Sequence, residues 1–205
     1  MSRDYQLTHE NLLTCAKQHF LDKGFEHASI REICKDANVT NGAFYNHFSD
    51  KEALFGALVA PVVEDIKKMY DDSVQQHIKL IDTDDLKSMW QLSESTIVRV
   101  IEYAYNHFDL FQLLLMCSEG TKYVDFLDNV VRLEVRESIK LFEELKLRGV
   151  LVRDIDEEEW HILVHAYYSS LAEVVMHNYS KQSALKYAHT LADFFSSGWQ
   201  KVLGI

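Results

Sequence analysis

The sequence of 205 residues contains a single proline and seven glycines, which is little of either residue. Because the many turns of an all-β fold depend on these two residues, the composition favours an all-α fold. The apolar runs are also short, whereas a helix that spans a membrane needs about twenty consecutive apolar residues. The N-terminal segment MSRDYQLTHENLL lacks the apolar stretch of a secretory signal. We therefore expect a cytoplasmic protein without a membrane segment.

Cysteine is scarce as well, because only Cys15, Cys34 and Cys117 are present and they form no CxxC pair. An odd and scattered set argues against a disulfide framework and against a zinc ribbon. Each of the three lies in an apolar helical context, which favours unreactive core thiols, with redox sensing as the alternative.

Positive charge is the third shortage, since 21 Lys and Arg face 32 Asp and Glu, for a net charge of −11. Residues 1–55 hold six basic and eight acidic side chains, a balance of −2, and residues 56–205 hold fifteen and twenty-four, a balance of −9. Proteins that bind nucleic acid usually present a basic surface. Any DNA-binding surface must therefore rely on a few local cations.

The N-terminal region shows the start and stop signals of successive helices. Residues 6–23 place apolar side chains on one helical face, and Gly24 follows as a stop signal. The sequence SIRE then predicts a capping box, in which Ser29 and Glu32 together begin a second helix.

A third helix is predicted over 41–47, with Thr40 as its N-cap and with Phe44 and Phe48 facing inward. The sequence SDKE, which starts at Ser49, forms a second predicted capping box before a fourth helix. Three helices with a tight turn between the second and the third are the layout of a helix-turn-helix domain.

The segment from Leu12 to Phe55 resembles the N-terminal domain of the tetracycline-repressor (TetR) family. The resemblance rests on KGF, SIREI followed by spaced Ala and Val, the pattern G.FY.HF, and KEALF. Two positions depart from the family pattern: Cys15 stands where alanine is frequent, and Asn38 stands where glycine commonly makes the turn. Asparagine tolerates left-handed backbone geometry nearly as well as glycine, so we expect the turn to survive.

The resemblance implies that the third helix enters the major groove of DNA, where base contacts specify the sequence and phosphate contacts position the protein. Polar side chains that merely face solvent are the alternative. The implied base contacts are Arg31, Thr40, Asn41, Gly42, Ala43 and Asn46. The implied phosphate contacts are Ser29, Tyr45, His47 and Lys51, with Tyr45 also close to the bases.

The rest of the chain also has a helical pattern. Pro61 is expected to kink or break the helix that contains it, and the segment FDLFQLLLM is apolar enough to require an interior position. We predict an all-α fold of about nine helices, with a three-helix DNA-binding domain at residues 1–50 and a larger ligand-binding and dimerisation domain at residues 51–205. The later predicted helices cover residues 84–106, 122–147, 157–179 and 182–203.

The last two predicted helices carry wide apolar stripes. In the TetR family two such helices pair with their two-fold mates, so the resemblance implies a homodimer, with burial inside one chain as the alternative. The candidate dimer residues are Trp160, Tyr167, Leu171, Leu191, Phe195 and Trp199.

Large side chains gather between residues 90 and 176, and they suggest an apolar pocket with a few polar groups. Ordinary core packing is the alternative for each of these side chains. By the resemblance, the pocket is expected to hold a small-molecule effector. The candidate pocket residues are Trp90, Tyr103, Phe108, Phe111, Met116, Glu119, Tyr123, Phe126, His165, Tyr168 and Glu173.

His161 and His165 stand four residues apart in HILVH, a spacing that can bind metal. Surface or core histidines are the simpler interpretation. The sequence has no nucleophile elbow, P-loop or dinucleotide-binding motif. We therefore expect no enzymatic activity, no cofactor and no metal site.

Together these patterns indicate a sequence-specific DNA-binding transcriptional regulator. We expect a ligand-responsive repressor that acts as a homodimer on a palindromic double-stranded operator. The alternative is a helix-turn-helix-shaped module that binds protein and has no specific DNA target, which the balance of −2 in residues 1–55 motivates.

Overall fold

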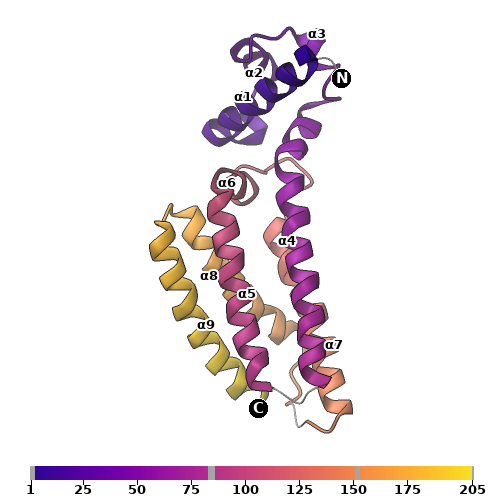
Figure 1. The fold of residues 1–205 in the computed structure, drawn as a ribbon, viewed down its shortest axis with the longest axis vertical. Coiled ribbons are helices and arrows are strands. Elements are labelled where there is room, and N and C mark those ends of the chain that lie inside the picture. The colour runs from indigo at the N-terminus through magenta and orange to yellow at the C-terminus, as the bar shows by residue number, and fades with distance from the viewer. Residues whose placement is uncertain (1–2, 83–85, 151–152, 205) are drawn as a thin grey trace. The chain divides into compact units, whose positions relative to one another are not determined.

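The computed structural model describes residues 3–82, 86–150 and 153–204. Within these ranges the chain forms nine α-helices and no β-strand (Figure 1), so the predicted all-α fold of about nine helices is confirmed. The helices are α1 Arg3–His27, α2 Ile30–Asp36, α3 Asn41–Phe44, α4 Lys51–Asp82, α5 Leu86–Asn106, α6 Phe108–Met116, α7 Phe126–Leu147, α8 Glu157–Met176 and α9 Lys181–Leu203.

The chain divides into two compact units. The N-terminal unit contains the chain up to Asp65 together with His107–Asp125, and the second unit contains Ile66–Asn106 together with the chain from Phe126 onward. The N-terminal unit is therefore larger than the DNA-binding domain predicted at residues 1–50.

Helix α6 enlarges the N-terminal unit because its sequence FDLFQLLLM must be buried. It packs against α1, and Leu113 is fully buried there. The backbone N–H of Phe25 donates to the carbonyl of Cys117 at 3.0 Å, which ties the end of α1 to the end of α6. Lys17 of α1 and Asp109 of α6 form an ion pair at 2.8 Å.

Aromatic side chains form the centre of the N-terminal unit. Phe20, Phe44 and Phe55 are completely buried, and the rings of Phe20 and Phe55 meet edge to face with centroids 5.1 Å apart. Aromatic pairs in this arrangement contribute about 0.5–1.5 kcal/mol beyond the burial of their area. The aromatic positions of helices one, three and four therefore hold the unit together.

The turn between α2 and α3 has the geometry expected for Asn38. This residue is left-handed, with φ of 55°, and its N–H donates to the carbonyl of Lys35 at 3.1 Å. The next N–H, of Val39, donates to the carbonyl of Cys34 at 2.8 Å. These two bonds make a Schellman motif, which satisfies the last carbonyls of α2 and directs the chain into α3.

Replacing Asn38 with alanine should lower the free energy of unfolding of the N-terminal unit by about 1 kcal/mol, because alanine tolerates a left-handed backbone less well. Replacement with glycine should leave stability nearly unchanged, since glycine adopts this conformation freely but gains entropy when unfolded. Urea denaturation followed by circular dichroism measures both variants. Equal stability of the alanine and glycine variants would contradict the role of the backbone geometry.

The two predicted capping boxes are wrong in detail. Ser29 occupies the N-cap position of α2, but its side chain makes no capping hydrogen bond. Glu32 accepts from Lys23 of α1 at 2.7 Å instead of reaching back to the start of its own helix. At the start of α4 the carboxylate of Asp50 accepts from the N–H of Ala53 at 2.7 Å, so Asp50 caps this helix rather than the preceding serine.

Helix α4 is continuous from Lys51 to Asp82, with Pro61 inside it, so of the predicted kink or break the break is wrong, and the kink stays a prediction. Pro61 cannot donate to the carbonyl of Ala57, but both residues lie on the exposed side of the helix. Water can satisfy a carbonyl at such a position, and this lowers the cost of a proline within a helix.

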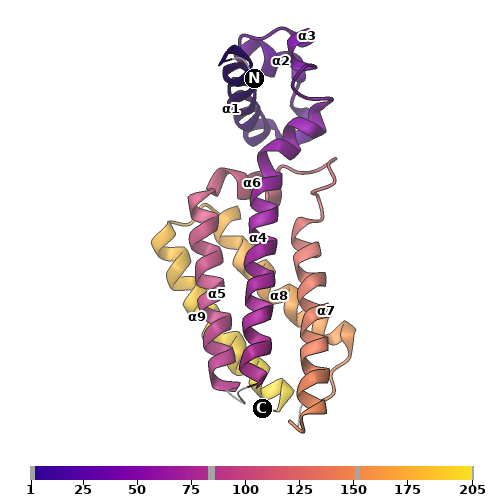
Figure 2. The ribbon, with the colours of Figure 1, turned by 45° about the vertical axis from the view of Figure 1, so that its right-hand side comes forward.

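The second unit is a bundle built from the later part of α4 and from α5, α7, α8 and α9. Helix α5 packs along α9, and α7 packs along α8 (Figures 1 and 2). A buried cluster of Val131, Val135, Trp160, Val164 and Leu203 joins α7, α8 and α9.

Candidate nucleic-acid interface and cavity

Helix α3 is a short element held from both sides. The hydroxyl of Thr40 accepts from the N–H of Ala43 at 3.1 Å, which confirms the predicted N-cap. Phe44 is fully buried and anchors the helix to the core. The helix ends at Phe44, and a turn continues to His47, so the α-helical part is shorter than the predicted 41–47.

The polar side chains on and around α3 remain on the surface. Tyr45 is 59% exposed although it is large and aromatic. Arg31 of α2 is exposed as well, and it forms no ion pair with any described residue. Such a surface can present donors and acceptors to the edges of bases. The other implied base contacts that are exposed are Thr40, Asn41, Gly42 and Asn46, while Ala43 and the implied phosphate contact Ser29 are partly buried.

His47 lies against α1. Its ring centroid is 4.0 Å from that of Tyr5 and 5.6 Å from that of His9, and its Nδ1 is buried without a partner. The hydroxyl of Tyr5 donates to the backbone carbonyl of Asn46 at 3.3 Å. Burial, followed by the charge of His9, lowers the pKa of His47 below its usual 6.5. This contact therefore helps to hold the end of the recognition segment against α1.

The N-terminal unit should lose stability as the pH falls below about 6.5, because a lowered pKa of His47 means that the unfolded chain binds a proton more readily than the folded chain. Above this pH the ring is neutral in both states and contributes no pH dependence. His47→Phe should reduce the dependence between pH 7.5 and 5.5, a range above the titration of most carboxylates. Thermal melts across this range test it, and an unchanged slope in the variant would contradict it.

Lys51 is placed differently from its implied role as a phosphate contact. Its ammonium donates to the backbone carbonyls of Phe25 at 2.6 Å, Glu26 at 3.0 Å and Ala28 at 3.0 Å. It also lies 4.4 Å from the centroid of the Phe25 ring. An ammonium has three donors, so these carbonyls occupy all of them. Burial lowers the pKa of Lys51.

Few cations of the N-terminal unit are available to DNA. Lys17 and Lys23 are held by acidic side chains, and Lys51 is held by backbone carbonyls. Among the first 55 residues, Arg31 and Lys35 are the described cations that are exposed and form no ion pair within the described ranges. The local supply of positive charge is thus even smaller than the composition indicates.

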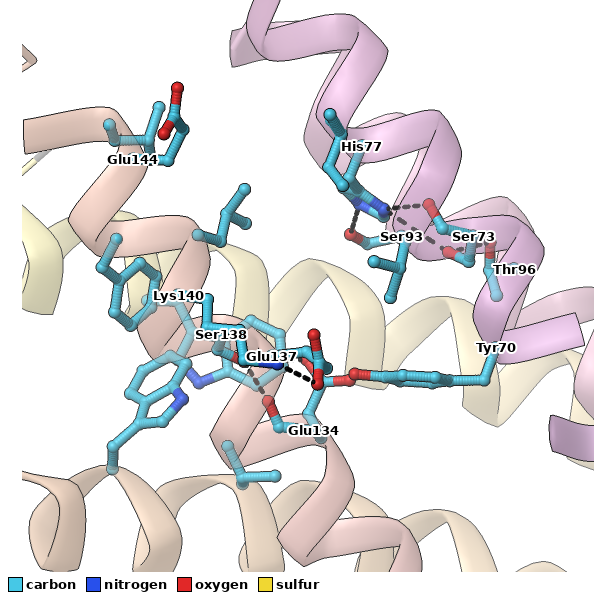
Figure 3. A pocket seen from close by; sticks show the side chains of 18 of the residues that line it. Tyr70, Ser73, His77, Ser93, Thr96, Glu134, Glu137, Ser138, Lys140 and Glu144 are labelled. Atoms are coloured by element: carbon cyan, nitrogen blue, oxygen red, sulfur yellow. Dashed lines mark hydrogen bonds and ion pairs between the residues drawn. The ribbon is translucent and has the colours of Figure 1, made fainter. Parts of the chain in front are cut away.

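The second unit contains a partly open cavity of about 420 Å³, a size within the range of small-molecule sites. Its walls come from α4, α5, α7, α8 and α9 (Figure 3). The apolar part includes Leu141, Phe142, Leu145, Trp160 and Trp199.

One polar group in the cavity surrounds Glu134 of α7. Its carboxylate accepts from the hydroxyls of Tyr168 at 3.2 Å and of Tyr70 of α4. The single O–H of Ser138 is 2.6 Å from the backbone carbonyl of Glu134 and 3.1 Å from its carboxylate, so the two oxygens share it. Burial and the charge of Glu134 raise the pKa of Tyr168, and burial with the charges of Glu134 and Glu137 raises the pKa of Tyr70. Both tyrosines are therefore neutral donors.

A second polar group lies at His77 of α4. Its Nδ1 is 2.8 Å from the carbonyl of Ser73, which can only accept, so Nδ1 carries a proton. Its Nε2 is 2.9 Å from the hydroxyl of Ser93, and the hydroxyl of Ser73 is 3.2 Å from that of Thr96. A neutral imidazole satisfies all of these contacts, so this end of the cavity is polar without requiring a charge.

The cavity differs from the pocket indicated by the sequence. Of the predicted pocket residues with described side chains, Tyr168 alone lines it, and the side chain of Trp90 lies outside what the structure describes. His165 and Glu173 are exposed on α8 and pair with Asp128 and His177. Tyr103 and Phe126 belong to the second unit without lining the cavity, and Phe108, Phe111, Met116, Glu119 and Tyr123 belong to the N-terminal unit.

Sequence reasoning missed Tyr70, His77 and Glu134. A signal for Glu134 does exist, because it lies beside Val131 and Val135, which are buried on α7. An acidic residue inside the apolar stripe of a helix is unusual, since buried carboxylates need partners. No comparable signal marks Tyr70 or His77 in the sequence.

The candidate dimer residues are mostly buried within their own chain. Trp160, Tyr167, Leu171 and Leu191 are at most 8% exposed, and the ring of Tyr167 packs against Trp199 with centroids 4.9 Å apart. The structure therefore buries these side chains within one chain, which is the alternative to a dimer interface at these positions. The large apolar side chains that α8 and α9 do expose include Ile162, at 67%, and Phe194, at 71%.

His161 and His165 have ring centroids 6.2 Å apart. No group of three or more His, Cys, Asp or Glu side chains suited to a metal ion occurs among the described residues. No helix in the described part of the chain is long and apolar enough to cross a membrane.

Part of the chain is similar to known bacterial regulatory proteins. Residues 12–58 match the family described as "Bacterial regulatory proteins, tetR family". The HTH-type transcriptional regulator UidR of Escherichia coli is 37% identical over 59 residues, which cover 29% of this chain and 30% of UidR. The Transposon Tn10 TetC protein of Escherichia coli is 30% identical over 105 residues, which cover 49% of this chain and 46% of that protein. The chain thus matches less than half the length of each of these relatives.

Two solved structures share the fold over nearly the whole chain. The native NalD structure, the secondary repressor of the MexAB-OprM multidrug efflux pump in Pseudomonas aeruginosa, aligns with a TM-score of 0.59 and 21% identity, over 97% of this chain and 98% of that one. Salmonella enterica GusR aligns with a TM-score of 0.57 and 20% identity, over 97% and 96% of the two chains. The helix-turn-helix segment of this protein thus matches the tetR family of bacterial regulatory proteins, and the chain shares its fold with solved TetR-family regulators.

Proposed function

We propose that this protein is a sequence-specific DNA-binding transcriptional regulator that acts in the cytoplasm as a homodimer and represses from a palindromic operator. The observation that carries the proposal is the exposed polar surface of α3, capped by Thr40 and anchored by Phe44, within the family-matched segment. Dimers and small-molecule effectors are typical of TetR-family regulators. The proposal assigns no enzymatic role to the chain.

The base contacts are assigned to the surface around α3. The side-chain amides of Asn41 and Asn46 can each form two hydrogen bonds with an adenine. The methyl group of Ala43 can contact the methyl group of a thymine. Arg31 at the start of α2 is the cation assigned to guanine or phosphate. Backbone N–H groups at the start of α4 add to the phosphate contacts, since a helix N-terminus attracts anions.

Selection of bound DNA from a random pool tests the proposal directly. A two-fold symmetric sequence is expected, with half-sites about one helical turn, ~34 Å, apart. Because so few cations are unpaired, the affinity for this operator should fall only gently with salt, at a slope near −0.9 for each neutralised phosphate. Failure to enrich any sequence would overturn the proposal.

The exposed side chains of α8 and α9 are assigned to the dimer. Replacing Phe194 with glutamate should convert the dimer into monomers. In a two-fold interface the substitution occurs in both subunits, so it removes two apolar side chains and brings two negative charges together. Light scattering after gel filtration measures the mass. Leu147→Glu on α7 is the matched control, since Leu147 is 83% exposed but lies on a different helix. A Phe194→Glu dimer of unchanged mass at micromolar concentration would rule out this interface.

The alternative of a protein-binding module is favoured by one observation, the ion pairing of Lys17 and Lys23. With these cations neutralised, the N-terminal unit has little charge with which to attract DNA. The salt titration separates the two functions, because a protein-binding module shows no salt-dependent affinity for any selected DNA.

The regulation is proposed to follow from the cavity of the second unit. A ligand that binds better to the state with lower operator affinity shifts the chain toward that state, by no more than its preference between the two states. The predicted lever is α4, which carries Tyr70 and His77 of the cavity and begins at Lys51, beside the helix-turn-helix.

A further inference from the structure

The three carboxylates that line the cavity differ in their partners. They are Glu134, Glu137 and Glu144, and the nearby cations are Lys140 and Arg148 in the lining and Arg136 beside Glu137. These formal charges balance in number, but the cations pair with only two of the three carboxylates.

Glu137 and Glu144 are neutralised by basic neighbours. Glu137 accepts from Arg136 at 2.9 Å and from Lys140 at 2.8 Å, and these bonds lower its pKa. Glu144 accepts from Arg148 at 2.6 Å. Neither carboxylate therefore leaves a charge that a ligand must balance.

Glu134 is different because its partners are hydroxyls. Tyr168 and Tyr70 donate to it, Ser138 shares its O–H between this carboxylate and the backbone carbonyl of Glu134, and no cation among the described residues pairs with it. A carboxylate has about four acceptor sites, so these donors leave at least one site open. Glu134 is partly buried, so water screens its charge less than on an open surface and an opposite charge beside it is favoured. Figure 3 shows Tyr70 of α4 directed toward Glu134 of α7.

Aromatic rings line the same cavity as this carboxylate. Tyr70, Tyr167, Tyr168, Trp160 and Trp199 all line the cavity. The faces of tryptophan and tyrosine rings attract cations, and the attraction is strongest where water is excluded. A single unneutralised carboxylate among such rings provides attraction for positive charge and apolar contact for the group that carries it.

We propose that the cavity binds an organic monocation with an apolar or aromatic body, and that Glu134 holds its positive charge. The apolar wall of Leu141, Leu145 and Phe142 takes the body of the ligand. The hydroxyls around His77 form hydrogen bonds with a neutral polar substituent of the ligand. That the same cation acts as the effector rests on the proposed function, whereas its binding does not.

The binding test uses the full chain and two probes of the same shape and opposite charge, tetraphenylphosphonium and tetraphenylborate. Isothermal titration calorimetry measures both affinities, with benzyltrimethylammonium as a smaller cation. We expect a cation to bind and tetraphenylborate to bind at least about tenfold more weakly. Glu134→Gln should lower the affinity for the cation by about tenfold or more, because it removes the negative charge that attracts the cation while it keeps the shape of the side chain.

Two further variants keep the result interpretable. Glu173→Gln is the matched control: its side chain is exposed on α8, pairs with His177 at 2.7 Å and does not line the cavity, so cation affinity should stay unchanged. Tyr70→Phe keeps the ring and removes one donor to Glu134, so it should retain the preference for the cation even if Glu134→Gln fails to fold. Equal binding of the two tetraphenyl probes, or no binding of either cation, would overturn the proposal.

An operator arm separates this proposal from the proposed function. Tetraphenylphosphonium is added to the complex of the protein with its selected operator, and release is followed by fluorescence anisotropy. Both the cation site and its effector role are supported if the cation releases the operator from the wild type and if Glu134→Gln needs about tenfold more cation for the same release. Cation binding without release leaves the site intact and removes the effector role, whereas cation binding by a protein that selects no DNA removes the proposed function alone.

Discussion

Replacing Phe44 with alanine should lower the free energy of unfolding of the N-terminal unit by about 3–5 kcal/mol and should abolish operator binding. Phe44 is completely buried, and its ring meets Phe48 and Tyr45 with centroids 5.8 and 5.2 Å apart. The four residues of α3 cannot form a stable helix alone, because nucleating a helix costs more than so short a segment regains. The packing of one side chain thus determines the position of the whole recognition surface.

Urea denaturation and operator binding by fluorescence anisotropy measure the two consequences of this change. Phe44→Leu is the matched control, because a hydrophobic exchange of similar volume usually costs less than about 1.5 kcal/mol. This variant should keep most of the operator affinity. An alanine variant that is folded and binds the operator within twofold of the wild type would show that α3 is positioned by other contacts.

The roles of Thr40, Phe44 and Asn38 were predictable because each depends on a signal that is local in the sequence. A capping residue lies next to its helix, and a turn residue is recognised by the backbone geometry it tolerates. The segment FDLFQLLLM was expected to need an interior position, and Phe111, Leu113 and Leu114 are buried while Met116 is 52% exposed. Its place in the N-terminal unit was not predictable, since the pattern does not identify the surface that buries it.

The residues of the cavity, in contrast, could not be predicted from local signals in the sequence. Tyr70, Glu134 and Tyr168 come from α4, α7 and α8, which are far apart in the sequence. A search for large side chains cannot find such a group, because the size of a residue does not decide which helix it faces. The same limit explains the dimer residues: an apolar stripe predicts burial, but it does not say whether a partner or the same chain covers it. Trp160 and Tyr167 are covered by their own chain.

Lys51 shows most clearly that the surroundings of a charged side chain decide its role. The resemblance to the TetR family implies a phosphate contact for this lysine. In the structure its aliphatic part lies at the Phe25 ring and its ammonium caps three carbonyls near the end of α1. These carbonyls would otherwise lack a partner at the end of the helix.

Lys51→Met should therefore destabilise the N-terminal unit by about 2–3 kcal/mol, because it removes a charged donor while it keeps the apolar stem. Lys35→Met, at an exposed lysine of α2, should change stability little. The salt dependence of operator binding separates the two possible roles of Lys51. A capping lysine leaves the slope of the folded variant unchanged, whereas loss of a phosphate contact reduces it by about 0.9. A stable Lys51→Met protein with a reduced slope would return Lys51 to the DNA-contacting surface, at the expense of the capping role that its three carbonyl partners indicate.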